Sequence, residues 1–358
     1  MDFSLSEERK MLQETVARFF ENNYKDIKNR GDYLALNDGF SREIWKESAD
    51  LGVISGLISP RFGGLGGSGE DISIIFELIG KSLCIEPFLS SGILSSTILS
   101  SIKNPKTELI NQIIDGELLI SFAHMEMNNR YEDHFVETKA FLEDDNWKLN
   151  GNKSFVINGD SADKVIVSAR IDGEINDKNG IGLFLVDTNQ ITSRSYNTID
   201  GYKASELNFD NVNAELLCKD DLALECIIKS NSAGALALSA EAVGIMQVCF
   251  DLTLDYLKTR KQFGKSIGAF QSIQHRMVDM MLEIEQVRSA VMLASSTFET
   301  NSSTRDKNVS AAKNLVGRVG KLIAEESIQL HGGIAMTWEY SVAHYAKRLI
   351  MIDHLMGD

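Results

Sequence analysis

The stretch Arg260-Lys-Gln-Phe-Gly-Lys-Ser-Ile-Gly268 decides the fold of the last third of this 358-residue chain. It forms a short polar break, with two glycines, between two long helical patterns. Two more patterned stretches follow it. Long helical patterns divided by short breaks are typical of antiparallel helices, so residues from Asp221 onward predict a four-helix bundle. The four patterns lie at about 223–260, 269–299, 307–330 and 341–355.

The first part of the chain, from Met1 to about Asp115, is also helical by pattern, since apolar residues recur at spacings of three and four. Ser4 and Glu7 have the capping-box spacing that marks a helix start. One glycine-rich stretch, Ile58–Gly69, interrupts the pattern, and by composition alone it predicts a flexible loop.

The middle part changes period. Short β-branched runs, such as Lys164-Val-Ile-Val-Ser-Ala and Ile181-Gly-Leu-Phe-Leu-Val, predict strands of an antiparallel β-domain built from hairpins. The expected turns are at Asn150-Gly151, Asn158-Gly159 and Asn179-Gly180. The fold class is therefore α+β. The predicted domains are a helical one at 1–117, a β-barrel-like one at 118–228 and the four-helix bundle at 229–358.

The composition of the chain limits the binding partners and the cellular compartment that the sequence predicts. A formal charge of −15, from 36 basic and 51 acidic residues, argues against nucleic acid and anionic membrane as partners. The sequence contains no run of about 18 apolar residues, so it predicts no membrane span. The acidic, amphipathic start resembles neither a secretory signal nor a transit peptide. The four cysteines show no C-x-x-C spacing, so we expect buried thiols in a reducing cytoplasm and no metal site.

Four ordered stretches together resemble the acyl-CoA dehydrogenase family, and the resemblance covers nearly the whole chain. The ending, with Thr337-Trp-Glu-Tyr340 and a stop soon after Met356, is similar to a shorter subfamily found in bacterial degradation of sterols and other bulky acyl-CoA compounds. The stretches are Ser59–Gly64, Asn150–Gly159, Arg260–Gly268 with Phe270, Gln271 and His275–Met280 after it, and Gln329–Tyr340.

The resemblance implies a function. In the family, a carboxylate removes the α-proton of an acyl-CoA thioester while the N5 atom of FAD takes a hydride from the β-carbon. The backbone N–H of the base residue helps to polarise the thioester oxygen. The resemblance also implies a tetramer, in which each flavin is held across a subunit boundary, and an electron-transfer flavoprotein as the acceptor. The process would be β-oxidation of fatty acids or steroids.

Six residues match the part of the family's flavin site that one subunit gives to its neighbour. A guanidinium such as that of Arg260 suits a diphosphate because it can donate two parallel hydrogen bonds. Paired glycines let backbone N–H groups approach a ligand closely. Taken alone, Arg260 could equally be a surface residue and the glycine pair a helix stop. The six residues are Arg260, Phe263, Gln271, Gln329, Gly332 and Gly333.

The sequence departs from the family at the catalytic base. Most members carry a glutamate where this chain has Met356, just before Gly357. A thioether cannot accept a proton at neutral pH. A minority carry the base at the position of Gly234, which has no side chain. Glu241, two helical turns further on, is either a relocated base or a carboxylate paired with a basic residue of the bundle. Asp353 and His354 are nearby in the sequence but are expected to face solvent.

A second departure affects the flavin cradle that the subunit keeps for itself. The family's glycine-rich loop corresponds here to Ser121–Arg130, which contains no glycine and has bulky Met125 and Met127. Phe155 retains an aromatic ring of the next motif, but Ile157 replaces a threonine that hydrogen-bonds the flavin. The loss of one such bond costs about 1 kcal/mol.

These departures predict a dehydrogenase subunit whose own site is degenerate, within a heterotetramer whose homologous partner supplies the base. Three alternatives stay open. The first is an active homo-oligomer that uses Glu241 as its base. The second is a flavin-free acyl-CoA-binding homologue. The third is a relative resembling flavin monooxygenases, since a fold does not fix chemistry.

Overall fold

The computed structural model describes residues 6–129 and 131–357 of the chain. Contacts divide the chain into two compact units. The first comprises Met1–Asp32, Ser68–Cys84 and Ala235–Asp358, and the second comprises Tyr33–Gly67 and Ile85–Gly234. The predicted bounds of three domains stay a prediction.

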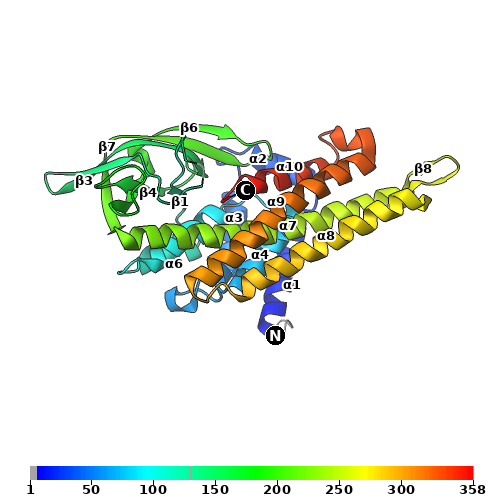
Figure 1. Cartoon of the computed structure of the whole chain (residues 1–358), viewed down its shortest axis with the longest axis horizontal. Coiled ribbons are helices and arrows are strands. Elements are labelled where there is room, and N and C mark those ends of the chain that lie inside the picture. Colours follow the sequence, from blue (N-terminus) through cyan, green and yellow to red (C-terminus); the bar gives the residue numbers. More distant parts are fainter. Residues whose placement is uncertain (1–5, 130, 358) are drawn as a thin grey trace. The chain divides into compact units, whose positions relative to one another are not determined.

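The first unit is helical and contains the predicted four-helix bundle (Figure 1). The longest helix, α7, runs from Asp221 to Thr259, and the part from Ala235 onward belongs to this unit. The helical patterns of the sequence are confirmed to within a few residues. The other helices are α1 (Glu7–Asn23), α2 (Ile27–Leu34, which continues into the second unit), α4 (Gly69–Ser82), α8 (Gln271–Ser296), α9 (Ser302–His331) and α10 (Val342–Asp353).

Capping side chains fix several helix starts in this unit. Ser6 caps α1 by accepting a hydrogen bond from the backbone N–H of Arg9. The predicted cap Ser4 lies outside the described residues. Ser68 and Asp71 form a reciprocal capping box at the start of α4.

Two glycines let α4 and α7 pack closely. A Cβ on Gly80 would lie 2.0 Å from the carbonyl oxygen of Glu241, and a Cβ on Gly244 would lie 2.0 Å from that of Glu77. Neither distance is possible for a real side chain, so the two backbones can meet only where both residues are glycine. This contact fixes the part of α7 that carries Glu241 against α4.

The helical elements of the second unit are short. The predicted loop at Ile58–Gly69 contains a 3-10 turn at Pro60–Phe62, and a Cβ on Gly64 would lie 1.9 Å from the carbonyl oxygen of Ile58. The glycines therefore form a compact turn. The remaining helical elements of this unit are α3 (Arg42–Asp50), α5 (Ser96–Ser101), α6 (Thr107–Ile114), a π-helix at Phe88–Ser95 and 3-10 turns at Ser55–Leu57 and Thr188–Gln190.

Seven strands form the sheet of the second unit, in the order β1-β4-β2-β3-β7-β5 with β6 paired to β7. Because β4 also pairs with β5, the ladder closes on itself as in a small barrel. Pairing is antiparallel as predicted except for β1 with β4, and β2 with β4, which run parallel. The strands are β1 (Ile120–Ala123), β2 (Lys139–Glu143), β3 (Asn146–Ile157), β4 (Lys164–Arg170), β5 (Ile181–Asp187), β6 (Thr192–Asn197) and β7 (Lys203–Lys219).

One predicted turn is wrong. Asn150-Gly151 lies inside β3, at an irregularity in its pairing with β7. A Cβ on Gly151 would lie 2.7 Å from the Cα atom of Thr138, so this glycine serves a close approach of two backbones rather than a reversal of the chain. Asn158-Gly159 and Asn179-Gly180 do lie just outside strands, as predicted.

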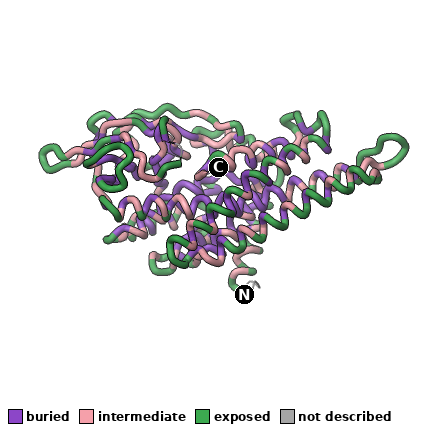
Figure 2. The backbone as a smooth tube through the Cα atoms, viewed as in Figure 1, coloured by how far each residue is buried: buried purple, intermediate pink, exposed green. Residues whose placement is uncertain are grey.

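Burial follows the pattern expected of a packed core (Figure 2). Among the described residues, α7 alone is long and apolar enough to cross a membrane, but 83% of its apolar window is buried inside the protein. A core helix has that property. All four cysteines are buried free thiols, as predicted: Cys84, Cys218, Cys226 and Cys249.

Candidate functional site

A two-residue hairpin presents the first predicted flavin residues. The strands β8 (Lys261–Gln262) and β9 (Lys265–Ser266) are joined by Phe263 and Gly264, whose φ angles are 51° and 79°. Two consecutive positive φ angles define the turn type that matches the twist of a hairpin. Phe263 is 88% exposed in this left-handed conformation. A bulky apolar side chain held there suggests a binding role.

The hairpin also orients two polar residues. Arg260 follows the last residue of α7, and Gln271 is the first residue of α8, so they flank the hairpin on either side. Both are exposed. The backbone of Arg260 is fixed at both groups, because its N–H donates to the oxygen of Tyr256 and its carbonyl accepts from Ile267. The guanidinium therefore extends from a rigid base.

The glycine pair lies at the end of α9. Gln329 is exposed in the last turn of α9, and Gly332 follows with φ 71° and ψ −151°, a conformation that suits glycine. A Cβ built on Gly332 or Gly333 meets no atom within 4 Å. The open space leaves the backbone of this pair accessible to a ligand, although the N–H of Gly332 already donates to the carbonyl oxygen of Ile328.

A buried histidine supports the glycine pair. The ring of His331, only 4% exposed, lies 4.6 Å from the ring of Tyr256 and 5.0 Å from that of Tyr340. Its Nδ1 atom is 2.7 Å from the carbonyl oxygen of Ser327. Burial lowers the pKa of His331. A neutral aromatic cluster thus fixes the end of α9 against α7.

In the second unit, the stretch predicted as the subunit's own flavin cradle is anchored by a buried carboxylate. Glu126 is 3% exposed and accepts hydrogen bonds from Lys153 at 2.5 Å and from the N–H and hydroxyl of Thr138 at 3.0 and 2.7 Å. Although burial opposes it, these contacts hold the pKa of Glu126 below its usual range. Met127 in this stretch is 86% exposed, and Arg130 lies outside the described residues.

A histidine completes this buried polar group. His124 is 6% exposed, and its Nδ1 atom lies 2.9 Å from the hydroxyl of Ser168, which also accepts from Lys153 at 3.0 Å. Burial, with help from the Lys153 ammonium, lowers the pKa of His124 to about 3. The imidazole is therefore neutral at physiological pH.

The two predicted flavin-contacting residues of β3 are half-buried. The ring of Phe155 lies 6.4 Å from that of Tyr196, whose hydroxyl donates to the oxygen of Ser154. Ile157 pairs with Ala204 on β7 and offers no hydroxyl. The aromatic surface is present, but the hydrogen-bond donor is not.

The positions predicted for the base hold Met356, Gly234 and the buried carboxylate of Glu241. Met356 is half-buried with φ 56°, one residue before Gly357 with φ 104°. Glu241 is 1% exposed, and Arg348 binds both of its oxygens. Gly234 lies within α7 and has no side chain. The carboxylate of Asp353 packs against α9, since its Oδ1 atom would lie 1.9 Å from a Cβ on Gly317.

The sequence analysis did not predict several buried charges, among them Lys153, Arg348 and Lys313, which are 0%, 3% and 3% exposed. Lys153 lies inside the Asn150–Gly159 motif, so its position could have signalled a role. The other two lie within helical patterns in which basic residues are ordinary surface residues. Among the described residues, no group of three or more His, Cys, Asp or Glu side chains could hold a metal ion.

Comparison with known proteins identifies related chains. Family models for the N-terminal, middle and C-terminal domains of acyl-CoA dehydrogenases match residues 6–114, 121–212 and 225–354. The chain is 28% identical to the acyl-CoA dehydrogenase IpdE2 of Mycolicibacterium smegmatis, over 99% of this chain and 96% of the relative. It is also 28% identical to the mitochondrial long-chain specific acyl-CoA dehydrogenase of Sus scrofa, over 94% of this chain and 80% of the relative.

Solved structures share the fold. Butyryl-CoA dehydrogenase from Megasphaera elsdenii superposes with a TM-score of 0.88 at 23% identity, over 100% of this chain and 96% of that one. The ChsE4-ChsE5 complex from Mycobacterium tuberculosis gives a TM-score of 0.86 at 21% identity, over 99% and 94% of the two chains.

Proposed function

The chain belongs to the acyl-CoA dehydrogenase family, whose cofactor is FAD, and from that premise we propose that it is a dehydrogenase subunit without its own general base. It would work in a heterotetramer with a homologous subunit that supplies the base. The observation that carries the proposal is the pair of base positions. Met356 occupies one and Gly234 the other, while the nearest carboxylate on α7, Glu241, is engaged on both oxygens by Arg348.

The missing base matters because of the chemistry. Bound FAD supplies the hydride acceptor for α,β-desaturation. A protein carboxylate must remove the α-proton, and a general base typically contributes about 10²–10⁴ in rate. Neither the thioether of Met356 nor a glycine can do this. The relocated-base alternative is not favoured, since Glu241 is buried and Arg348 already occupies both of its carboxylate oxygens.

The flavin residues support a site shared between subunits. Arg260, Gln271 and Gln329 are exposed, and the backbone at Gly332 and Gly333 borders open space. A cationic fork with two amide side chains fits the diphosphate and adenosine parts of FAD. In contrast, Ile157 lacks the hydroxyl that would reach the flavin ring. The residues that one subunit would give to its neighbour's flavin site are therefore present in this chain. Part of the flavin site that the subunit would use itself is missing.

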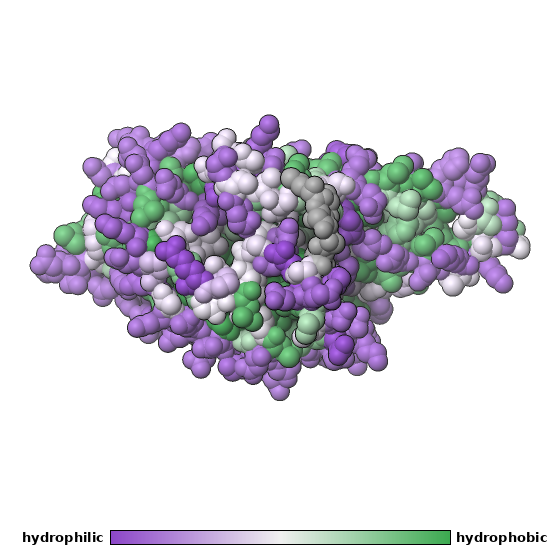
Figure 3. Space-filling model, turned by 90° about the horizontal axis from the view of Figure 1, so that it is seen from below, coloured by the Kyte–Doolittle hydropathy of each residue, from purple (hydrophilic) through white to green (hydrophobic). Residues whose placement is uncertain are grey.

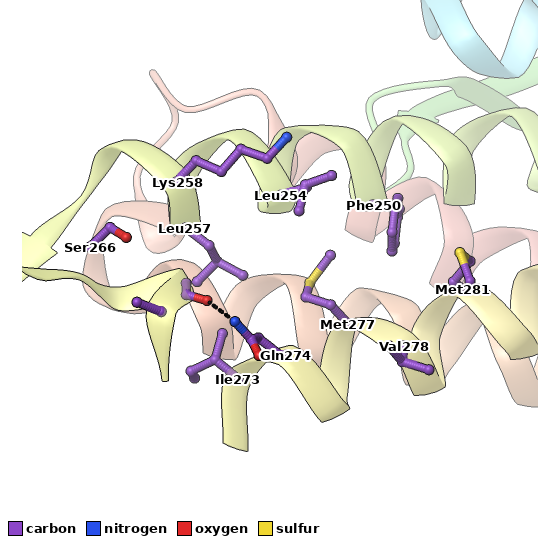
Figure 4. A pocket seen from close by; sticks show the side chains of 12 residues that line it. Phe250, Leu254, Leu257, Lys258, Ser266, Ile273, Gln274, Met277, Val278 and Met281 are labelled. Atoms are coloured by element: carbon purple, nitrogen blue, oxygen red, sulfur yellow. Dashed lines mark hydrogen bonds between the residues drawn. The ribbon is translucent and has the colours of Figure 1, made fainter. Parts of the chain in front are cut away.

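An apolar cavity beside the hairpin supports the assembly. It has a volume of about 430 Å³ and lies between α7 and α8. Leu257, Met277 and Ile273 point into it, and Gln274 donates to the oxygen of Gly268 at its edge at 3.0 Å (Figure 4). The space-filling view shows apolar side chains gathered next to the hairpin end of the molecule (Figure 3).

Exposure of the apolar side chains on α8 points the same way. Val278, Met281 and Leu282 are 49%, 46% and 53% exposed. Adjacent exposed apolar residues of this kind mark interaction sites in soluble proteins. We therefore place the homologous subunit on this face. The substrate would be an acyl-CoA thioester with a bulky acyl group such as a steroid fragment, and the acceptor an electron-transfer flavoprotein in the cytoplasm.

The test is expression of the chain alone and together with homologous chains that carry a glutamate at the terminal position. Alone, the chain should bind FAD below one equivalent, as read from flavin absorbance, and should oxidise acyl-CoA slowly or not at all. Together, the two chains should co-purify with full flavin content and rapid turnover. Full flavin occupancy and fast acyl-CoA oxidation by the isolated chain would refute the proposal. Complete absence of flavin in every combination would favour an acyl-CoA-binding homologue.

A further inference from the structure

A buried lysine on α9 holds the end of the chain. Lys313 is 3% exposed, which is rare for a lysine and requires compensating partners. Its Nζ atom donates to the carbonyl oxygen of Asp353 at 3.1 Å and to that of Gly357. One ammonium thus links the last residue of α10 to the segment that follows it.

Gly317 allows that approach. It lies four residues after Lys313 on α9, and therefore on the same face of the helix. A Cβ at this position would lie 1.9 Å from the Oδ1 atom of Asp353. Any other residue would push the end of α10 away from α9. The ammonium of Lys313 and the missing side chain of Gly317 together hold the terminal segment against α9.

The segment held by Lys313 and Gly317 has an uncommon backbone conformation. Leu355 is 4% exposed, and it is followed by Met356 and Gly357 with φ angles of 56° and 104°. A methionine in the left-handed region is disfavoured unless the surroundings impose it. A cation that binds the last carbonyl oxygens of a helix and its following turn supplies such a constraint.

We infer that Lys313 is a positioning residue for the turn that carries residue 356. It acts through the carbonyl oxygens of Asp353 and Gly357, and so fixes the direction of the backbone N–H of Met356. This inference rests on the proposed function and on the family resemblance, which implies that the N–H of residue 356 donates to the thioester oxygen of a bound acyl-CoA. The thioether at 356 cannot act as a base, but the contacts that hold the backbone of this turn are present.

The first experiment reads the position of the turn in the full-length chain. Lys313→Met keeps the length and removes the donors, Lys313→Arg keeps a cation, and Lys321→Met is the control. Lys321 is on the same helix, but its side chain is 65% exposed and reaches Glu325 only at 4.0 Å. Amide hydrogen exchange of the peptide spanning 355–357 should rise about tenfold or more in Lys313→Met, since charge-assisted hydrogen bonds are lost. Lys313→Arg should recover part of the protection, and Lys321→Met should match the parent. Unchanged protection in Lys313→Met overturns the inference.

The second experiment separates positioning from a purely structural role. In a Met356→Glu background, deuterium incorporation at the α-carbon of butyryl-CoA is followed against pH. Asp353 and His354 are the other titratable groups on this turn, and every variant retains them. Loss of the Lys313 cation should raise the pH midpoint of exchange, because a nearby positive charge favours the ionised carboxylate. A midpoint that stays in place while the protein is folded also overturns the inference. If no variant exchanges the α-proton although protection changes as expected, the proposed function fails and the positioning role stands.

Discussion

Arg348 on α10 binds both carboxylate oxygens of Glu241 on α7, from Nε at 2.6 Å and from Nη2 at 2.9 Å. The two side chains are 3% and 1% exposed. Parallel charge-assisted bonds of this kind are strong and fix both partners. Glu241 therefore ties two helices of the bundle together, and its oxygens are already occupied.

Removing one partner of this pair should destabilise the bundle. Arg348→Met leaves a buried carboxylate without its cation, and we expect a loss of about 3–5 kcal/mol in the free energy of unfolding, measured by chemical denaturation. Glu283→Gln is the control. Glu283 pairs with Arg318, whose side chain is 56% exposed, and surface pairs are worth about 0–1 kcal/mol. Equal effects of both substitutions would contradict the structural role.

Arg260 should determine flavin retention by the assembly. Arg260→Ala removes an exposed guanidinium, and loss of charge-assisted hydrogen bonds to a diphosphate should weaken FAD binding by about 10- to 100-fold. The measurement is the ratio of flavin to protein after gel filtration, with Lys321→Ala as a matched loss of charge on the same unit. Retention equal to that of the parent would refute the assignment of Arg260.

Restoring a carboxylate should restore part of the chemistry. In Met356→Glu, we expect deuterium exchange at the α-carbon of a bound acyl-CoA to rise by a factor of about 10²–10⁴, the usual contribution of a general base. Flavin reduction should rise less, because the cradle at Ile157 is still incomplete. Met356→Gln has the same length without the basic oxygen and serves as the control. No change in either quantity would mean that residue 356 does not face the substrate.

The glycine contact between α4 and α7 should tolerate no methyl group. Gly244→Ala and Gly80→Ala each place a Cβ about 2.0 Å from a backbone carbonyl oxygen. Overpacking of this kind typically costs about 1–3 kcal/mol, which thermal unfolding would detect. Gly31→Ala is the matched control, because nothing lies within 4 Å of its Cβ in helix α2. That substitution should be neutral or stabilising by about 0.5–1 kcal/mol.

Burial of His124 should make stability depend on pH. The pKa of His124 is lowered from 6.5 to about 3 in the folded protein, so the unfolded chain takes up a proton that the folded chain refuses. Stability is therefore highest above pH 6.5 and falls as the pH drops from 6.5 towards 3, by up to about 1.4 kcal/mol per pH unit. Glu126, whose pKa is also lowered, adds to the loss only below its ordinary value of 4.5.

The pH range from 6.5 to 4.5 therefore excludes the contribution of Glu126, but it includes Glu299, whose pKa is raised by burial. Burial lowers the pKa of His331 and His344 as well, so the comparison must be between the parent and His124→Asn. The free energy of unfolding of His124→Asn should fall less steeply across this range. Parallel slopes for the two proteins would show that His124 is not the group responsible.

The sequence predicted the helices well because hydrophobic period is a local property. All four patterns of the last third became helices, and the strands at Lys164 and Ile181 begin at the predicted residues. The turn at Asn150-Gly151 was wrong because the same dipeptide that favours a hairpin also permits close approach of two strands. Only the partner residue Thr138, on the preceding loop, decides between these outcomes.

The buried charges could not be predicted from local patterns. Lys313 and Arg348 are spaced in the sequence like solvent-facing helical residues, and their partners lie 40 and 107 residues away. Pairing over such separations is set by how the helices cross. The family resemblance assigned the six predicted flavin residues of the last third of the chain, and their roles stay predictions. Their exposure on the first unit is what the structure adds.

The apolar cavity between α7 and α8 has a consequence for the lifetime of this chain in a cell. Side chains such as Met281 and Phe263 are accessible to solvent in the single chain and resemble the surfaces that chaperones and proteases recognise in incomplete assemblies. A partner that covers them would protect the chain from removal. The amount of this subunit should therefore follow the amount of its partner, and excess copies should be short-lived.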